Sequence, residues 1–289
     1  MKHTPKITLI LLGIFLLAQF FGIAILYNYI DFEKSSEEET VFREVPFVER
    51  PPVNEKTFFV PVILAVFVGT IIFLILLKYK LIWIMKVWYL IALFISLSTA
   101  FNAFIPITLA GALGLVLSIW KVFKPNFWVQ NGTELFIYGG LAAIFVPLFN
   151  LFSGVVLLIL IAAYDAYAVW KSKHMIKLAK SQTEAKMFAG LLIPYTIGEK
   201  NKLPSVKKIK DKVRTAILGG GDIGFPLIFA GIVLKELGLW QSLVIPFFAT
   251  AGLAILFWKA DHQKFYPAMP FISTGCLVGL GIVWLIGSW

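Results

Sequence analysis

The feature that most constrains the fold is an apolar stretch of 40 residues from Leu81 to Trp120, whose only charge is Lys86. As one helix this stretch would be about 60 Å long, roughly twice the hydrocarbon thickness of a bilayer. The chain must therefore turn back within it, and Asn102 to Pro106 is the best breaking point. Overall the chain is 59% hydrophobic and 15% charged, whereas soluble domains are about 25% charged, which predicts a multi-spanning membrane protein.

The same reasoning along the chain predicts an all-α polytopic protein with nine transmembrane helices. A second long apolar stretch must also turn back, and Pro147, Asn150 and Gly154 mark its break. The expected spans are 7–30, 58–77, two within 81–120, two within 135–170 divided near residue 150, 215–234, 239–258 and 270–289.

Charge predicts which ends of these helices face the cytoplasm. Residues 171–214 hold twelve lysines and arginines against three acids, whereas residues 31–57 hold eight acids against four bases. Basic loops mark the cytoplasmic side, so the N-terminus is predicted inside and the C-terminus outside. The net charge of +10 then indicates contact with lipid headgroups and not with nucleic acid.

These predictions describe one membrane-embedded domain, 1–289. Helices one to six occupy 1–170, a basic cytoplasmic loop occupies 171–214, and helices seven to nine occupy 215–289. Lys121 is expected in the inner loop after helix four, and Glu134 is expected to reach the interface from helix five. Asn131-Gly132-Thr133 matches a glycosylation acceptor, but by chance, because it is predicted on the cytoplasmic side.

Residue usage gives no support for metal or redox chemistry. Cys276 is the only cysteine, so an intrachain disulfide is excluded, and the three histidines, at 3, 174 and 262, show no metal-ligand spacing. No metal and no cofactor are predicted.

Two carboxylates fall inside apolar segments, Asp165 and Asp222. A charge at bilayer depth costs a few kcal/mol even on lenient scales, so such acids are functional-site candidates. Asp165 lies six residues before the basic loop begins and Asp222 eight residues after it ends, or about 9 and 12 Å along a helix. Paired carboxylates at one depth would share a proton, so that one activates a water and the other polarises a carbonyl group.

The surroundings of Asp222 and one proline-rich stretch favour close approach of a peptide backbone. Glycines at 219, 220, 221 and 224 remove side chains around Asp222, although membrane helices also use glycine simply to pack. Residues 266–270 carry two prolines three apart and are predicted to be extended. On local sequence alone, a plain loop with proline in the first helical turn explains that stretch at least as well.

These stretches together resemble a known family. Tyr164-Asp165, Gly219-Gly220-Gly221-Asp222 and Pro267-Ala268-Met269 resemble the YD, GxGD and PAL signatures of the presenilin and signal peptide peptidase aspartyl proteases. Their order and the nine-helix topology also match, so the resemblance spans most of the chain. The short loops look most like those of archaeal presenilin homologues, which implies a prokaryotic, archaeal cell membrane.

The resemblance implies an intramembrane aspartic endopeptidase that cleaves transmembrane helices or remnant signal peptides, with Asp165 and Asp222 as the catalytic pair. It implies supporting roles for Tyr164, Gly219 and Gly221, and for the PAL-like residues Pro267, Ala268 and Met269. Met269 replaces the leucine of that signature, a volume-conserving change that is expected to alter substrate preference and to retain activity. The implied partners are transmembrane-helix substrates and the bilayer, and the sequence predicts no oligomeric state.

The apolar segment 187–197 lies inside the basic loop, between the two catalytic helices. It is predicted to lie near the active site and to hold an unwound substrate by β-augmentation, with Leu191, Leu192 and Ile193 positioning the substrate. An amphipathic segment at the membrane surface is an equally good interpretation.

A different class of function also fits intramembrane acids. Proton- or ion-coupled transporters and channels use such residues, and broken helices are common among them. That alternative predicts ion-dependent flux without peptide cleavage. Prepilin peptidases also carry an aspartate after GxG, but they do not explain the proline-rich stretch 266–270.

Overall fold

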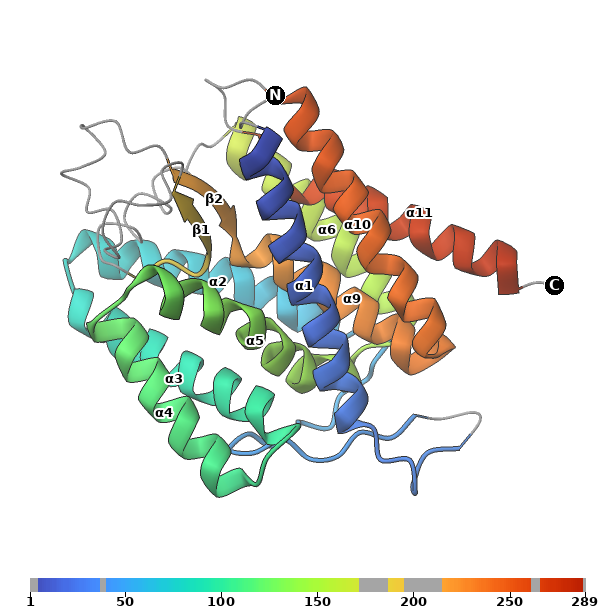
Figure 1. Ribbon diagram of the computed structural model, residues 1–289, viewed down its shortest axis with the longest axis horizontal. Coiled ribbons are helices and arrows are strands. Elements are labelled where there is room, and N and C mark those ends of the chain that lie inside the picture. The colour runs from blue at the N-terminus through green and yellow to red at the C-terminus, as the bar shows by residue number, and fades with distance from the viewer. Residues whose placement is uncertain (1–4, 37–39, 172–186, 195–214, 261–265, 288–289) are drawn as a thin grey trace.

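The computed structural model describes residues 5–36, 40–171, 187–194, 215–260 and 266–287. Within these ranges the chain forms nine α-helices, a short 3-10 helix and one two-stranded sheet (Figure 1). The helices are α1 (Pro5–Tyr29), α2 (Phe59–Lys78), α3 (Ile82–Asn102), α4 (Ile107–Phe123), α5 (Phe127–Phe145), η1 (Val146–Leu148), α6 (Leu151–Trp170), α9 (Gly220–Leu237), α10 (Leu239–Lys259) and α11 (Met269–Gly287).

Seven of the described helices are long and apolar enough to cross a membrane, which identifies an integral membrane protein. The shorter α4 and the Asp222-bearing α9 fall outside this set. Nine membrane spans and the orientation of the termini therefore stay predictions.

Both long apolar stretches turn back where the sequence predicts. Helix α3 ends at Asn102, and Pro106 is the residue that precedes α4. In the second stretch α5 passes into η1, and α6 begins after Asn150 with a capping box. There the Asn150 side chain accepts from the Ser153 backbone N–H at 2.9 Å, and Ser153 Oγ accepts from the Asn150 N–H at 3.0 Å.

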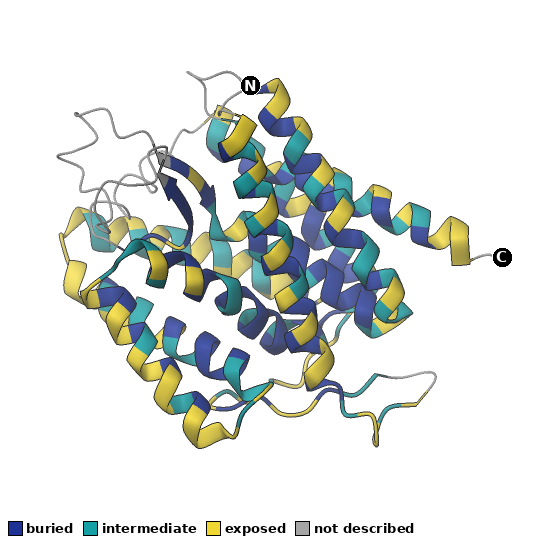
Figure 2. Cartoon of the chain, in the orientation of Figure 1, coloured by how far each residue is buried: buried dark blue, intermediate teal, exposed yellow. Residues whose placement is uncertain are grey.

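The centre of the molecule is formed by α1, α5 and α9. Helix α1 packs against α5, α9 and α10, and α5 packs against α3 and α9. Helices α3 and α4 form a hairpin on one side of this centre and α10 and α11 pack together on the other (Figure 1). Buried residues gather where α5 and α9 meet (Figure 2).

The prediction of a helix beginning at residue 215 is wrong. Strand β2 (Thr215–Gly219) pairs antiparallel with β1 (Gly190–Pro194), with Gly190 opposite Gly219, and α9 begins only at Gly220. A short apolar run does not show by its periodicity whether it is strand or helix, and here distant backbone groups decide. The all-α prediction is therefore corrected to a mostly helical fold with one two-stranded antiparallel sheet in the described ranges.

The predicted start of helix five and the predicted surroundings of Glu134 are also wrong. Helix α5 begins at Phe127, where Asn126 caps it by accepting from the Val129 N–H at 2.8 Å. The segment 131–134 is therefore helical, and Glu134 is buried in an ion pair with Lys121 instead of reaching the interface. Lys121 is equally buried and lies within α4, not in a loop.

Candidate active site

Asp165 lies near the end of α6, five residues before the helix ends at Trp170. Its side chain is buried, and its Oδ2 accepts a hydrogen bond from the backbone N–H of Met269 at 3.1 Å. This contact joins two segments that are 104 residues apart and orients the carboxylate.

The proline-rich stretch enters this contact from the start of α11. Residues 266–268 have no regular secondary structure, and α11 begins at Met269, one residue earlier than predicted. Pro267 and Met269 are buried and Ala268 is partly buried. Because the chain is irregular up to Ala268, the N–H of Met269 is not used within α11 and reaches Asp165 instead.

Asp222 is the third residue of α9 and is partly buried. Helix α9 packs against α6, so the two aspartates come from neighbouring helices. Asp165 lies near the C-terminal end of α6 and Asp222 near the N-terminal end of α9. The Asp222 carboxylate points back toward Gly219, the last residue of β2. A β-carbon built on Gly219 would lie only 3.2 Å from Asp222 Oδ2.

The three glycines before Asp222 differ in how tightly they are packed. A β-carbon on Gly220 would lie 2.6 Å from the Tyr138 hydroxyl oxygen, too close for any side chain without movement. At Gly221 the nearest atom would be 3.5 Å away, on Phe225, which is an ordinary contact. The closest approach is therefore at Gly220, the variable position of the GxGD pattern, and not at Gly219 or Gly221.

Tyr164 lies in an apolar groove between α2 and α6. The Tyr164 ring meets Phe67 edge-on with ring centroids 5.2 Å apart, and its hydroxyl lies 3.5 Å from Thr70 Oγ1. The groove has a volume of about 510 Å³, and its lining includes Ile63, Phe67, Thr70, Leu160 and Tyr164.

Leu191, Leu192 and Ile193 form the middle of strand β1, and all three are buried. The strand pairs with β2, which leads directly into Gly220 and Asp222. Only residues 187–194 of the predicted substrate-positioning segment are described, and residues 195–197 lie outside the described ranges.

Several polar residues near this site were missed by the sequence reasoning. Gln19, buried in α1, donates from Nε2 to the carbonyl oxygen of Ile223 at 2.9 Å, one residue after Asp222. On α5, Gln130, Glu134 and Tyr138 are linked by hydrogen bonds. Their spacing of four residues, on one face of a helix, is the sequence signal that would have found them.

No group of three or more histidine, cysteine, aspartate or glutamate side chains in the described ranges is placed to hold a metal ion.

Comparison with known proteins gives one family and one fold. The family model described as signal-peptide peptidase, presenilin aspartyl protease matches residues 13–288. Two structures of a presenilin family intramembrane aspartate protease, in the C222 and P2 space groups, are similar in fold. The first has a TM-score of 0.62 at 17% identity and covers 96% of this chain and 99% of its own. The second has a TM-score of 0.61 at 18% identity and covers 96% of both chains. No curated protein matches the chain.

Proposed function

Because this chain belongs to the signal-peptide peptidase and presenilin family of aspartyl proteases, we propose that it hydrolyses peptide bonds within transmembrane helices, including remnant signal peptides. The catalytic pair is Asp165 and Asp222. The observation that carries this proposal is the packing of α6 against α9, which presents one carboxylate from the corresponding end of each helix.

The proposed reaction divides two roles between the carboxylates. One aspartate is ionised and takes a proton from a water molecule, whose oxygen attacks the carbonyl carbon of the scissile bond. The other is protonated and donates a hydrogen bond to the carbonyl oxygen, which becomes negative in the transition state. The Met269 N–H holds Asp165 Oδ2 in a fixed direction during this exchange.

The groove between α2 and α6 supports lateral entry of a substrate helix. It is lined by apolar side chains together with Thr70, Tyr164 and Tyr167, which suits a transmembrane helix better than a polar ligand. Tyr164 in its wall is the immediate neighbour of Asp165 in sequence. In this proposal the helix enters from the bilayer beside α2 and unwinds next to the carboxylates.

The hairpin supports β-augmentation on strand β2. Both backbone groups of Leu192 bond to the Asn131 side chain, so that edge of β1 is occupied. Along an antiparallel strand, the backbone groups of successive residues point alternately to its two sides. The N–H and C=O of Leu191 and Ile193 therefore point to β2, and those of Ile217 and Gly219 point to the outer edge of β2. Within the described residues no further strand pairs with that edge, and an extended substrate added there would run directly toward Asp222.

The first test is cleavage of a tagged single-span helix by purified protein in detergent. Asp165→Asn and Asp222→Asn are expected to lower product formation about 100- to 10,000-fold or more, because each removes one proton-transfer group at nearly constant shape. Asp31→Asn, in the loop after α1 where Asp31 pairs with Lys34 at 3.3 Å, is the matched control. Full activity in either active-site variant would contradict the proposed pair.

The strand-edge role is tested by Ile217→Pro against Ile217→Ala. The proline removes an N–H that the register assigns to the outer edge, where proline is tolerated. Cleavage is expected to fall in Ile217→Pro and to change little in Ile217→Ala, because the Ile217 side chain is exposed. Equal cleavage by both variants would contradict augmentation at this edge.

The transporter alternative gives the opposite pattern. Wild-type protein that cleaves none of several single-span helices but carries ions or protons across liposomes, in a manner lost in Asp165→Asn, would replace the protease proposal.

A further inference from the structure

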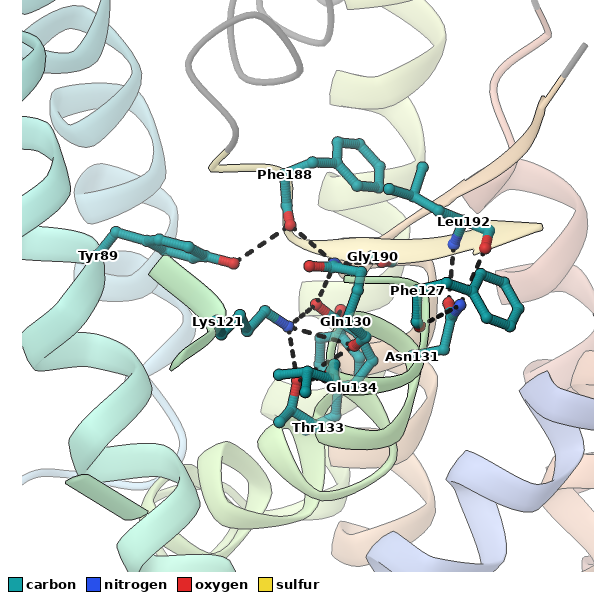
Figure 3. A network of polar contacts seen from close by, with 12 residues as sticks. Tyr89, Lys121, Phe127, Gln130, Asn131, Thr133, Glu134, Phe188, Gly190 and Leu192 are labelled. Atoms are coloured by element: carbon teal, nitrogen blue, oxygen red, sulfur yellow. Dashed lines mark hydrogen bonds and ion pairs between the residues drawn. The ribbon is translucent and has the colours of Figure 1, made fainter. Parts of the chain in front are cut away.

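A buried ion pair joins α4 to α5 at a distance from the two aspartates in sequence. Lys121 Nζ lies 2.5 Å from Glu134 Oε1, and each side chain is 1% exposed (Figure 3). Lys121 also donates to Thr133 Oγ1 at 2.9 Å. Such a pair loses much of its attraction to desolvation, so its contribution to stability is a weak reason for its presence.

The same glutamate binds two further side chains of α5. Gln130 Nε2 donates to Glu134 Oε1 at 3.0 Å, and the Tyr138 hydroxyl donates to Glu134 Oε2. Glu134 therefore fixes the side chains one turn before it and one turn after it on the same helix face.

Two amide side chains of α5 extend this network to the strand β1. Gln130 Nε2 donates to the carbonyl oxygens of Phe188 and Gly190 at 3.0 and 2.9 Å. Asn131 donates from Nδ2 to the Leu192 carbonyl at 2.9 Å and accepts the Leu192 N–H at 3.0 Å. Figure 3 shows these side chains directed at the strand, with Asn131 in the place that a third strand would take.

A third helix reaches the same point. Tyr89 of α3 donates its hydroxyl to the Phe188 carbonyl at 3.2 Å, so α3 and α5 hold one backbone oxygen together (Figure 3).

The held segment leads to Asp222 by two routes. Strand β1 pairs with β2, and beyond the paired residues the Gly220 N–H donates to the Ala189 carbonyl at 3.1 Å. From the other side, the Tyr138 ring packs against Gly220 and Gly224. Both routes meet at Gly220, the first residue of α9 and two residues before Asp222.

We propose that Lys121, Gln130, Asn131, Glu134 and Tyr138 are positioning residues for Asp222. Gln130 and Asn131 hold β1 at the edge that does not pair with β2, and Tyr138 packs against Gly220, which has no side chain. In this way the residues set the place of the Asp222 carboxylate without touching substrate. This inference rests on the proposed protease function. It predicts a loss in the chemical step, because a displacement of about 1 Å caused far from the chemistry can cost about 100-fold in rate.

The first test is Asn131→Leu, which keeps the side-chain volume and removes both bonds to Leu192. We expect kcat for a single-span substrate to fall about 100-fold, with KM changed less than about twofold. Amide hydrogen exchange at residues 190–193 is expected to accelerate. Asn28→Leu is the matched control, because Asn28 is exposed and its side chain donates within its own helix, to the Ala24 carbonyl at 2.9 Å.

A second variant separates positioning from folding. Lys121→Met/Glu134→Leu removes both charges at similar volume, and such replacements of buried pairs are often neutral or stabilising. The double variant is expected to stay folded, with a thermal transition closer to wild type than that of Lys121→Met alone, because no unpaired charge is left buried. It is still expected to lose kcat, because Gln130 and Tyr138 lose their common acceptor. Wild-type kcat in this folded double variant would overturn the proposal.

The two proposals fail in different ways. Faster amide exchange at residues 190–193 in Asn131→Leu with unchanged kcat overturns the positioning role and leaves the protease intact. Wild-type protein without cleavage of any substrate overturns the protease, and with it the catalytic meaning of the network.

Discussion

The two proposed catalytic aspartates have opposite surroundings. Asp222 follows strand β2, whose partner strand β1 is bound by amide side chains of α5. Helix α5 is itself largely buried, to 67% over its apolar part together with η1. Asp165 lies on α6. This helix also lines the apolar groove that it shares with α2, and α2 has no buried residue. One wall of the site is thus held by directional bonds, and the other by sparse apolar contacts.

This difference suits the two tasks of an intramembrane protease. A catalytic carboxylate needs a fixed place, which a buried and satisfied polar network provides. A bulky substrate helix needs an entrance, and a segment with few buried contacts opens at low free-energy cost. The contrast therefore predicts that substitutions on the α5 side disturb stability and chemistry, whereas those on the α2 side act on substrate entry.

The largest effect is expected from Lys121→Met alone. Removing the lysine leaves the Glu134 carboxylate buried without its cation, which should cost about 3–5 kcal/mol of unfolding free energy. Leu64→Ala on α2, where Leu64 is 61% exposed, should change it by less than about 0.5 kcal/mol. Thermal unfolding in detergent measures both, and equal shifts would remove the contrast between the two walls.

Gly220→Ala is expected to have the next largest effect. The new methyl group would lie 2.6 Å from the Tyr138 hydroxyl oxygen, and overpacking of this kind costs about 1–3 kcal/mol. Cleavage should fall more than in Gly221→Ala, where the added carbon meets Phe225 at 3.5 Å. Tyr138→Phe, placed in the Gly220→Ala background, removes the nearest clashing atom and should restore part of the lost stability. A larger loss in Gly221→Ala would contradict this packing.

The parts of the fold that were predictable depend on length and local chemistry. Each apolar stretch was too long for one helix, and Asn102, Pro106 and Asn150 turn the chain where the sequence indicated. The candidate carboxylates were found in the same way, because charge inside an apolar segment is costly wherever the chain folds.

The parts that were missed depend on distant partners. Residues 215–219 are apolar enough for a helix, and only pairing with 190–194 makes them a strand. The position of Glu134 near the end of a predicted helix indicated the interface, and the sequence does not show that its partner is Lys121 on a different helix. The four-residue spacing of Gln130, Glu134 and Tyr138 predicts a polar stripe on one face of a helix. It does not predict that Gln130 binds strand β1.

Gln19→Leu is expected to have a smaller effect than the α5 substitutions. It removes the bond to the Ile223 carbonyl, worth about 0.5–1.5 kcal/mol, but also removes the buried Gln19 Oε1, which has no hydrogen-bond partner among the described residues. The two changes partly cancel, so unfolding should shift by about 1 kcal/mol or less. A loss above that of Gly220→Ala would show that α1 controls the start of α9 more strongly than α5 does.

The smallest effect on stability is expected from Thr70→Val in the α2–α6 groove. Thr70 Oγ1 donates to the Val66 carbonyl at 2.7 Å inside its own helix, so the contact with Tyr164 at 3.5 Å is a long one in which the tyrosine is the donor. Losing the contact with Tyr164 should change the free energy of unfolding by less than about 0.5 kcal/mol. If substrate passes between these helices, the more apolar wall should alter KM while kcat stays within about twofold. A change confined to kcat would instead mean that Tyr164 acts on the carboxylates. The α2 side would then not be limited to substrate entry, which would contradict the contrast with the α5 side.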